Sequence, residues 1–95
     1  IMSLNKVNEE MINDLYDLIL SLKDNQDCRD LFSDMCTNKE VEQMAQRIRA
    51  ARLLLEGKTY NEVIDETDIS SATLSRVSRC VQYGSGYKRL VEYKK

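Results

Sequence analysis

Histidine and proline are absent from this chain of 95 residues, glycine occurs three times and phenylalanine once. Proline and glycine are the residues that most often interrupt helices, so their scarcity favours a largely helical structure. No stretch has the composition of a flexible linker or a low-complexity segment. We therefore predict a single all-α domain over residues 1–95.

The residue combinations of catalytic and metal sites are also missing. Without histidine, and with no serine or cysteine next to an evident base, the chain has no recognisable nucleophile or acid-base pair. Cys28, Cys36 and Cys80 match no zinc spacing. We predict that the protein is not an enzyme and needs no metal or other cofactor. The thiols are expected to be small, partly buried side chains, with a redox sensor as the alternative.

Long apolar runs are absent as well, and the apolar patches are as short as residues 53–55. A membrane-spanning helix needs about 18 or more apolar residues, so we predict no membrane span. An odd number of cysteines without a signal-like N-terminus is typical of a reducing compartment, which predicts a cytoplasmic protein.

Charge is distributed unevenly, although the formal net charge is only -2. Residues 1–36 carry 3 basic and 8 acidic side chains, residues 37–58 carry 5 and 3, residues 59–68 carry 0 and 4, and residues 69–95 carry 6 and 1. Attraction to phosphate depends on local positive charge. The negative net charge of the whole chain therefore does not argue against DNA binding near the C-terminus. The alternative is that the basic C-terminal side chains only keep the chain soluble.

Apolar residues that recur every three or four positions predict amphipathic helices. One helix is expected from about residue 5 to 22 and a shorter one near 27–36. A last short helix is expected over residues 87–93, with Leu90 and Val91 inside. With the three helices described next, these make about six.

Thr37 opens the best specified helix, because Glu40 stands three residues later as a capping box requires, and Gly57 suits its C-terminal cap. We expect residues 1–56 to supply core and dimerisation helices. Their apolar faces exceed what so short a chain needs for its own core, which indicates self-association. The inner stripe of the Thr37 helix is expected to hold Val41, Met44, Ala45, Ile48, Ala51 and Leu55.

Residues 58–81 have the pattern of a helix-turn-helix. A first helix with Val63 inside runs to Thr67, and a second helix follows Ser70, which is well placed as its N-cap. Asp68 stands at the position that often holds glycine in a left-handed conformation, and aspartate tolerates that conformation.

The second helix of this motif has a buried and a polar face. Its buried face is expected to hold Ala72, Leu74, Val77 and Val81. Its polar face carries hydroxyls and arginines that can reach base edges and phosphates in a major groove. We predict contacts at or near base edges from Ser71, Thr73 and Arg76. Phosphate contacts are predicted from Lys58, Thr59, Tyr60, Ser75 and Arg79.

Two alternatives compete with a DNA-binding motif. One is an ordinary amphipathic hairpin whose polar face is only solvated. The other is a helical dimeric protein-interaction module without DNA binding, although such a face ordinarily carries aromatic or large apolar anchors. A steep salt dependence would favour DNA over a protein partner.

The run from Cys36 to Tyr87 resembles the YerC/YecD group of Trp repressor-like proteins, most specifically in the segments MAQR, LLLEGKTYNEV and ATLSRVSRC. The resemblance implies a six-helix, intertwined homodimer that binds double-stranded DNA and regulates transcription, as a repressor. It also implies two reading heads, one helix-turn-helix from each protomer, related by two-fold symmetry. These meet major grooves about 34 Å apart on a palindromic operator.

The related tryptophan repressor binds its corepressor between the third helix and the reading helix, through a threonine, two arginines and a glycine. Thr37, Arg47 and Arg76 match the first three by alignment, whereas Val77 replaces the glycine. A branched side chain there would fill space that an indole ring needs, and overpacking costs about 1 to 3 kcal/mol. We therefore expect no control by tryptophan. The two arginines are expected to be structural, to bind another small anionic effector, or to contact the DNA backbone.

Overall fold

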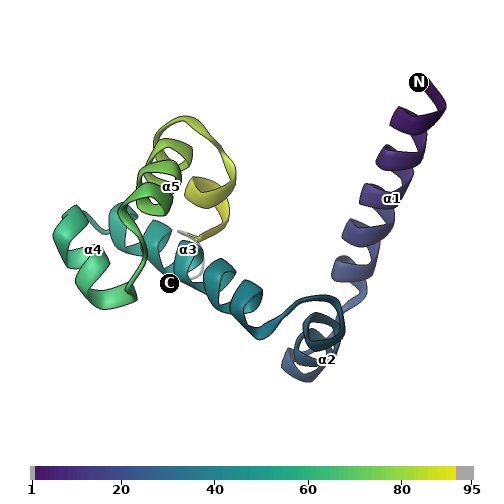
Figure 1. The fold of residues 1–95 in the computed structure, drawn as a ribbon, viewed down its shortest axis with the longest axis horizontal. Helices are drawn as coiled ribbons and strands as arrows, with labels where there is room; N and C mark the ends of the chain where they lie inside the picture. Colours follow the sequence, from purple (N-terminus) through teal and green to yellow (C-terminus); the bar gives the residue numbers. More distant parts are fainter. Residues whose placement is uncertain (1, 92–95) are drawn as a thin grey trace. The chain divides into compact units, whose positions relative to one another are not determined.

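A computed structural model describes residues 2–91, with side chains from residue 8 onward. Six helices and no strand occur in this part of the chain, which confirms the all-α fold class. The chain divides into two compact units, Ile1–Met35 and Cys36–Lys95. One domain over residues 1–95 stays a prediction. The helices are α1 (Met2–Ser21), α2 (Asn25–Met35), α3 (Asn38–Leu55), α4 (Tyr60–Thr67), α5 (Ser71–Tyr83) and the π-helix η1 (Tyr87–Val91) (Figure 1).

The first unit contains α1 and α2, close to the predicted bounds. Asp24 and Asp27 shape the connection between them: the Asp27 N–H donates to Asp24 Oδ1 at 2.8 Å, and the Lys23 N–H donates to Asp27 Oδ2 at 3.0 Å. No side chain within residues 8–35 is buried, and Cys28 is exposed, contrary to the prediction for this thiol. The large apolar side chains that α1 exposes are Met11, Ile12, Leu15, Tyr16, Leu18, Ile19 and Leu20.

In the second unit, α4, α5 and η1 each pack against α3 (Figure 1). The predicted capping box of α3 is confirmed: Thr37 Oγ1 accepts from the Glu40 N–H at 3.1 Å, and the Thr37 N–H donates to Glu40 Oε1 at 2.8 Å. Glu56 is the C-cap, and Gly57 follows at φ 91, a conformation in which an added side chain would be strained. The buried core consists of Ala50, Ala51, Leu53, Val63, Ile69, Leu74 and Val77.

The predicted inner stripe of α3 is only partly correct. Ala51 is buried, but Val41, Ala45 and Ile48 are exposed, and Ile48 keeps 46 % of its surface accessible. The buried side chains of α3 all lie in its C-terminal half. Three positions of the apolar stripe therefore stay accessible in the described part of the chain. Met44 and Leu55 are half-buried.

Two further core predictions need correction. Leu74 and Val77 are buried and Val81 is half-buried, as predicted, but Ala72 is exposed. A helix turns about 100° per residue, so Ala72 and Leu74 point about 160° apart around the helix axis. Ser78, four residues after Leu74, is buried instead.

In η1, Val91 is buried as predicted, whereas Leu90 is 53 % exposed. The two residues are adjacent in the helix, so they point in different directions and cannot both face α3. The predicted end of this helix at residues 92–93 lies outside the described residues. Of the remaining cysteines, Cys36 and Cys80 are free thiols and half-buried, as predicted.

Candidate nucleic-acid interface

The predicted helix, connector and second helix of residues 58–81 are present as α4, residues 68–70 and α5. Asp68 adopts the left-handed conformation predicted for it, with φ 62 and ψ 21. Its N–H donates to the Ile64 carbonyl at 2.8 Å, which closes the last turn of α4. Ile69, in the middle of the connector, is 3 % exposed and belongs to the core. The short connector is therefore held by a backbone hydrogen bond and by burial of its central side chain.

Ser70 is the N-cap of α5, as predicted. Its Oγ accepts from the Thr73 N–H at 3.2 Å and donates to Thr73 Oγ1 at 2.9 Å. The hydroxyl of Ser70 is therefore committed to the helix end. The hydroxyl of Thr73 accepts one of these bonds and keeps its own proton, so it can still donate to a ligand.

The polar face of α5 is accessible to solvent. Ser71, Ser75, Arg76 and Arg79 are exposed, and Thr73 is half-buried. Leu74 at 0 % and Val77 at 2 % exposed lie on the opposite face, against the rest of the second unit. The structure thus gathers all five side chains that we assigned to α5 for DNA on surface that a ligand can reach.

The remaining three candidates stand at the start of α4. Lys58 and Tyr60 are exposed, and Thr59 is the N-cap. Thr59 Oγ1 accepts from the Glu62 N–H at 3.2 Å, while the Thr59 N–H donates to Glu62 Oε1 at 2.9 Å. This second capping box was not predicted, although a threonine with glutamate three residues later is its ordinary signal. Thr59 is thus a structural residue, whose hydroxyl and backbone N–H both serve the helix end.

Negative charge limits where α4 can approach a polyanion. Glu62, Asp65, Glu66 and Asp68 are all exposed along α4 and its cap. Like charges repel, so the length of α4 disfavours a phosphate backbone, whereas its N-terminus offers free N–H groups beside Lys58. Glu62 also lies in the first turn, so Lys58, just before the helix, is the side chain at this end that favours a phosphate.

The pKa of the Glu62 carboxyl lies below its ordinary value of 4.5. The main causes are the hydrogen bonds from the Thr59 backbone and side chain, and nearby Lys58 adds a smaller effect, while slight desolvation opposes them. The ionised carboxylate is therefore the form that the start of α4 favours.

This lowered pKa predicts an acid-sensitive cap. A carboxyl whose folded pKa is depressed stabilises the fold above its ordinary pKa, and this contribution is lost as pH falls through the depressed value. Glu62→Gln keeps an acceptor oxygen but cannot ionise. In thermal melts followed by circular dichroism, the Tm advantage of the unmodified chain over this variant should shrink between about pH 6 and about pH 3. A difference in Tm that stays constant with pH would contradict this account.

A pocket of about 530 Å³ adjoins α5 at Thr73 and Arg76. Arg47 from α3 and Arg76 from α5 both line it, and Val77 contributes to its wall. Thr37 does not line this pocket within the described chain, and its hydroxyl is engaged in the capping box of α3. Three of the four predicted pocket residues are therefore brought together. The other residues that line the pocket are Thr73, Cys80 and Tyr87.

Comparison with known proteins gives a family match for residues 10–94, to the family described as Trp repressor protein. The chain belongs to the Trp repressor family. It is 44 % identical over 84 residues to YerC, an uncharacterized protein of Bacillus subtilis (strain 168), in a match that spans 88 % of this chain and 81 % of that protein.

Two solved structures of Trp repressor-like proteins have the same fold. One, a candidate Trp repressor from Staphylococcus aureus, is 32 % identical with a TM-score of 0.87, covering 99 % of this chain and 95 % of that one. The other, a TrpR-like protein from Eubacterium eligens ATCC 27750, is 40 % identical with a TM-score of 0.86, covering 94 % and 93 %. The resemblance to the YerC group of Trp repressor-like proteins is therefore confirmed.

Membership of the Trp repressor family favours a DNA-binding regulator over an enzyme. Among the described residues, no helix is both long and apolar enough to cross a membrane. The same residues contain no group of three or more His, Cys, Asp or Glu side chains placed to hold a metal ion.

Proposed function

We propose that this member of the Trp repressor family is a sequence-specific, cytoplasmic DNA-binding protein that represses transcription as a homodimer. The observation that carries the proposal is the division of α5 into a buried apolar face and an accessible face of hydroxyls and arginines. A recognition helix needs this division, because one side must be braced by the protein while the other enters the major groove. Neither a cofactor nor a membrane takes part.

Base edges are read by the first two turns of α5. Ser71 and Thr73 lie in its first turn, where a hydroxyl can donate to or accept from a base. Arg76 is exposed one turn later and can bind guanine through two hydrogen bonds. The cap formed by Ser70 supports this role, since it fixes the Thr73 hydroxyl at 2.9 Å from Ser70 Oγ before any DNA is bound.

Phosphates are contacted on both sides of the reading surface. Lys58, Thr59 and Tyr60 meet the backbone at the start of α4, where free N–H groups add to the attraction for an anion. Ser75 and Arg79 meet it from α5, where both are exposed. These contacts position the protein on the duplex without reading its sequence.

A homodimer accounts for the apolar surface that a single chain leaves uncovered. The α1 side chains carry much of it, with Leu20 at 82 % and Met11 at 56 % exposed. In the second unit, Ile48 and Leu90 line an apolar hollow of about 510 Å³. Contiguous apolar surface of this kind marks an association site in soluble proteins. A two-fold dimer also places two copies of α5 for successive major grooves, about 34 Å apart, which matches a palindromic operator.

The pocket beside α5 is not a tryptophan site in this proposal. Val77 lines it and is only 2 % exposed, so its branched side chain is fixed in the wall where the family's corepressor site has glycine. Arg47 and Arg76 on the same pocket suit a small anionic effector. Thr37 joins this site only if another copy of the chain brings it there.

Selection from a pool of random duplexes with the purified protein tests the proposal. A palindromic site should be enriched, and its affinity should be the same with and without tryptophan. Recovery of random sequence alone, at low salt and with no enrichment over the starting pool, would contradict sequence-specific binding.

Thr73→Ala should relax sequence preference more than it weakens binding. The variant removes the hydroxyl proposed to meet a base, and one good base contact is worth about 1 to 3 kcal/mol of discrimination. We expect the ratio of affinities for the selected and a single-mismatch duplex to fall about tenfold, measured by fluorescence anisotropy.

Thr73→Ser is the matched control, because it keeps the hydroxyl and removes only a methyl group. It should retain most of the discrimination. If Thr73→Ala instead weakens the selected, mismatched and unrelated duplexes by one common factor, Thr73 does not read a base.

A further inference from the structure

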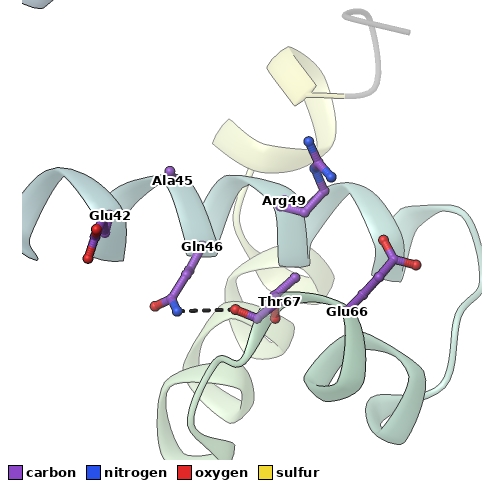
Figure 2. A pocket seen from close by; sticks show the side chains of 6 residues that line it. All are labelled: Glu42, Ala45, Gln46, Arg49, Glu66 and Thr67. Atoms are coloured by element: carbon purple, nitrogen blue, oxygen red, sulfur yellow. Dashed lines mark hydrogen bonds between the residues drawn. The ribbon is translucent and has the colours of Figure 1, made fainter.

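A polar notch of about 360 Å³ lies where α3 passes the end of α4 (Figure 2). In Figure 2 the Gln46 side chain reaches from α3 to the backbone of Thr67, the last residue of α4. Gln46 Nε2 donates to the Thr67 carbonyl oxygen at 3.1 Å, and both residues are partly buried. This bond joins the central helix of the unit to the start of the α4–α5 connector.

No other side-chain hydrogen bond in the described part of the chain spans more than four residues, whereas this one spans 21. The carbonyls in the last turn of a helix have no intrahelical partner, so an outside donor is needed at Thr67. A carbonyl only accepts, and the amide group of glutamine supplies the donor.

Thr67 also forms hydrogen bonds to the preceding turn and to the connector. Thr67 Oγ1 donates to the Val63 carbonyl at 2.7 Å and accepts from the Ile69 N–H at 3.2 Å. Gln46 thereby holds a residue that is bonded both to the preceding turn of α4 and to the middle of the connector. Asp68, in the left-handed conformation, directly follows Thr67, and Ser70 is the N-cap of α5.

We propose that Gln46 is a positioning residue for the reading helix: its hydrogen bond to Thr67 sets the direction in which the connector delivers α5 to DNA. The inference rests on the proposed function, because it concerns sequence reading by α5. Gln46 itself touches no base or phosphate in this account. The hydrogen bond of Gln46 should therefore raise the affinity for the selected duplex more than the affinity for an unrelated duplex. Reading a base needs the helix held to within about 0.5 Å, whereas non-specific phosphate attraction does not.

The test compares Gln46→Met with Gln43→Met. Methionine is close to glutamine in length and helix propensity but cannot donate a hydrogen bond. Gln43 lies on the same helix three residues earlier and is exposed, so it is a matched control. A hydrogen bond of this kind changes an equilibrium constant about fivefold.

Two measurements are made on both variants. Amide hydrogen exchange of residues 68–71, followed by NMR without DNA, should become about fivefold faster in Gln46→Met and stay unchanged in Gln43→Met. The ratio of affinities for the selected duplex and an unrelated duplex of equal length should fall about fivefold for each reading head in Gln46→Met only.

Each outcome decides a different point. Equal exchange in the two variants would overturn the claim that Gln46 holds the connector. Faster exchange with equal losses on selected and unrelated DNA would show a structural residue and overturn the positioning role. If the unmodified chain selects no duplex, the proposed function fails, while the exchange comparison still tests the hold of Gln46 on the connector.

Discussion

Raising the salt concentration from 50 to 200 mM should weaken binding to the selected duplex about 150-fold, because each proposed reading head would place two basic side chains on phosphates. Lys58 and Arg79 are both exposed, and the proposed homodimer would carry four such contacts. With a slope of about -0.9 for each neutralised phosphate, the logarithm of affinity should fall with the logarithm of salt at about -3.6. Titrations at several salt concentrations measure this slope.

Arg79→Ala sharpens the same experiment. Removal of one phosphate contact from each head should reduce the slope to about -1.8, so the same rise in salt should weaken binding only about 12-fold. At low salt the variant should bind selected and unrelated duplexes more weakly by a similar factor. Arg29→Ala is the control, since Arg29 is exposed on α2 in the acidic first unit and lies outside the proposed surface.

The salt experiment also separates the two classes of function. A protein-interaction module would show little affinity for any duplex at low salt and therefore no such slope. An Arg29→Ala effect as large as that of Arg79→Ala would show that the contact surface has been placed wrongly.

Leu74→Ala should cause the largest loss of stability among single changes in α5. Leu74 is 0 % exposed and lies in the core formed by α3, α4 and α5. Truncation of a fully buried leucine removes apolar contacts and leaves a cavity, at a cost of about 2 to 5 kcal/mol. For a chain of this size the lower bound corresponds to a Tm decrease of about 8 °C or more in circular dichroism melts.

The control for this prediction is the next residue. Ser75→Ala changes an exposed side chain on the same helix and should alter stability by no more than about 0.5 kcal/mol. Both variants must be compared at one protein concentration, since association stabilises a dimer by mass action. A Leu74→Ala melt indistinguishable from that of Ser75→Ala would contradict the burial of Leu74.

Local signals in the sequence were sufficient for the ends of several helices. Thr37 with Glu40, Ser70 before α5 and left-handed Asp68 were all predicted and are all observed. Each depends on groups within four residues of one another, so the sequence contains the whole interaction. The Thr59–Glu62 capping box has an equally local signal and could have been found in the same way.

Predictions of burial were less complete, because periodicity shows which side of a helix is apolar and not what covers it. Val41, Ala45 and Ile48 continue the apolar stripe of α3, yet they are exposed in the described chain. Ala72 is apolar and lies two residues before buried Leu74, but it points away from that side chain. A small apolar side chain is common on either face, so composition alone could not place it.

The candidate interface combines both kinds of information. The sequence by itself determined the helical class, the position of α5, its N-cap and the residue types on its polar face, since these depend on helical periodicity and short-range hydrogen bonds. Only the tertiary structure decided that Thr37 lies outside the pocket shared by Arg47 and Arg76 and that Gln46 bonds to Thr67. Those contacts join residues 21 or more positions apart, and such distances in sequence are closed only when the helices pack.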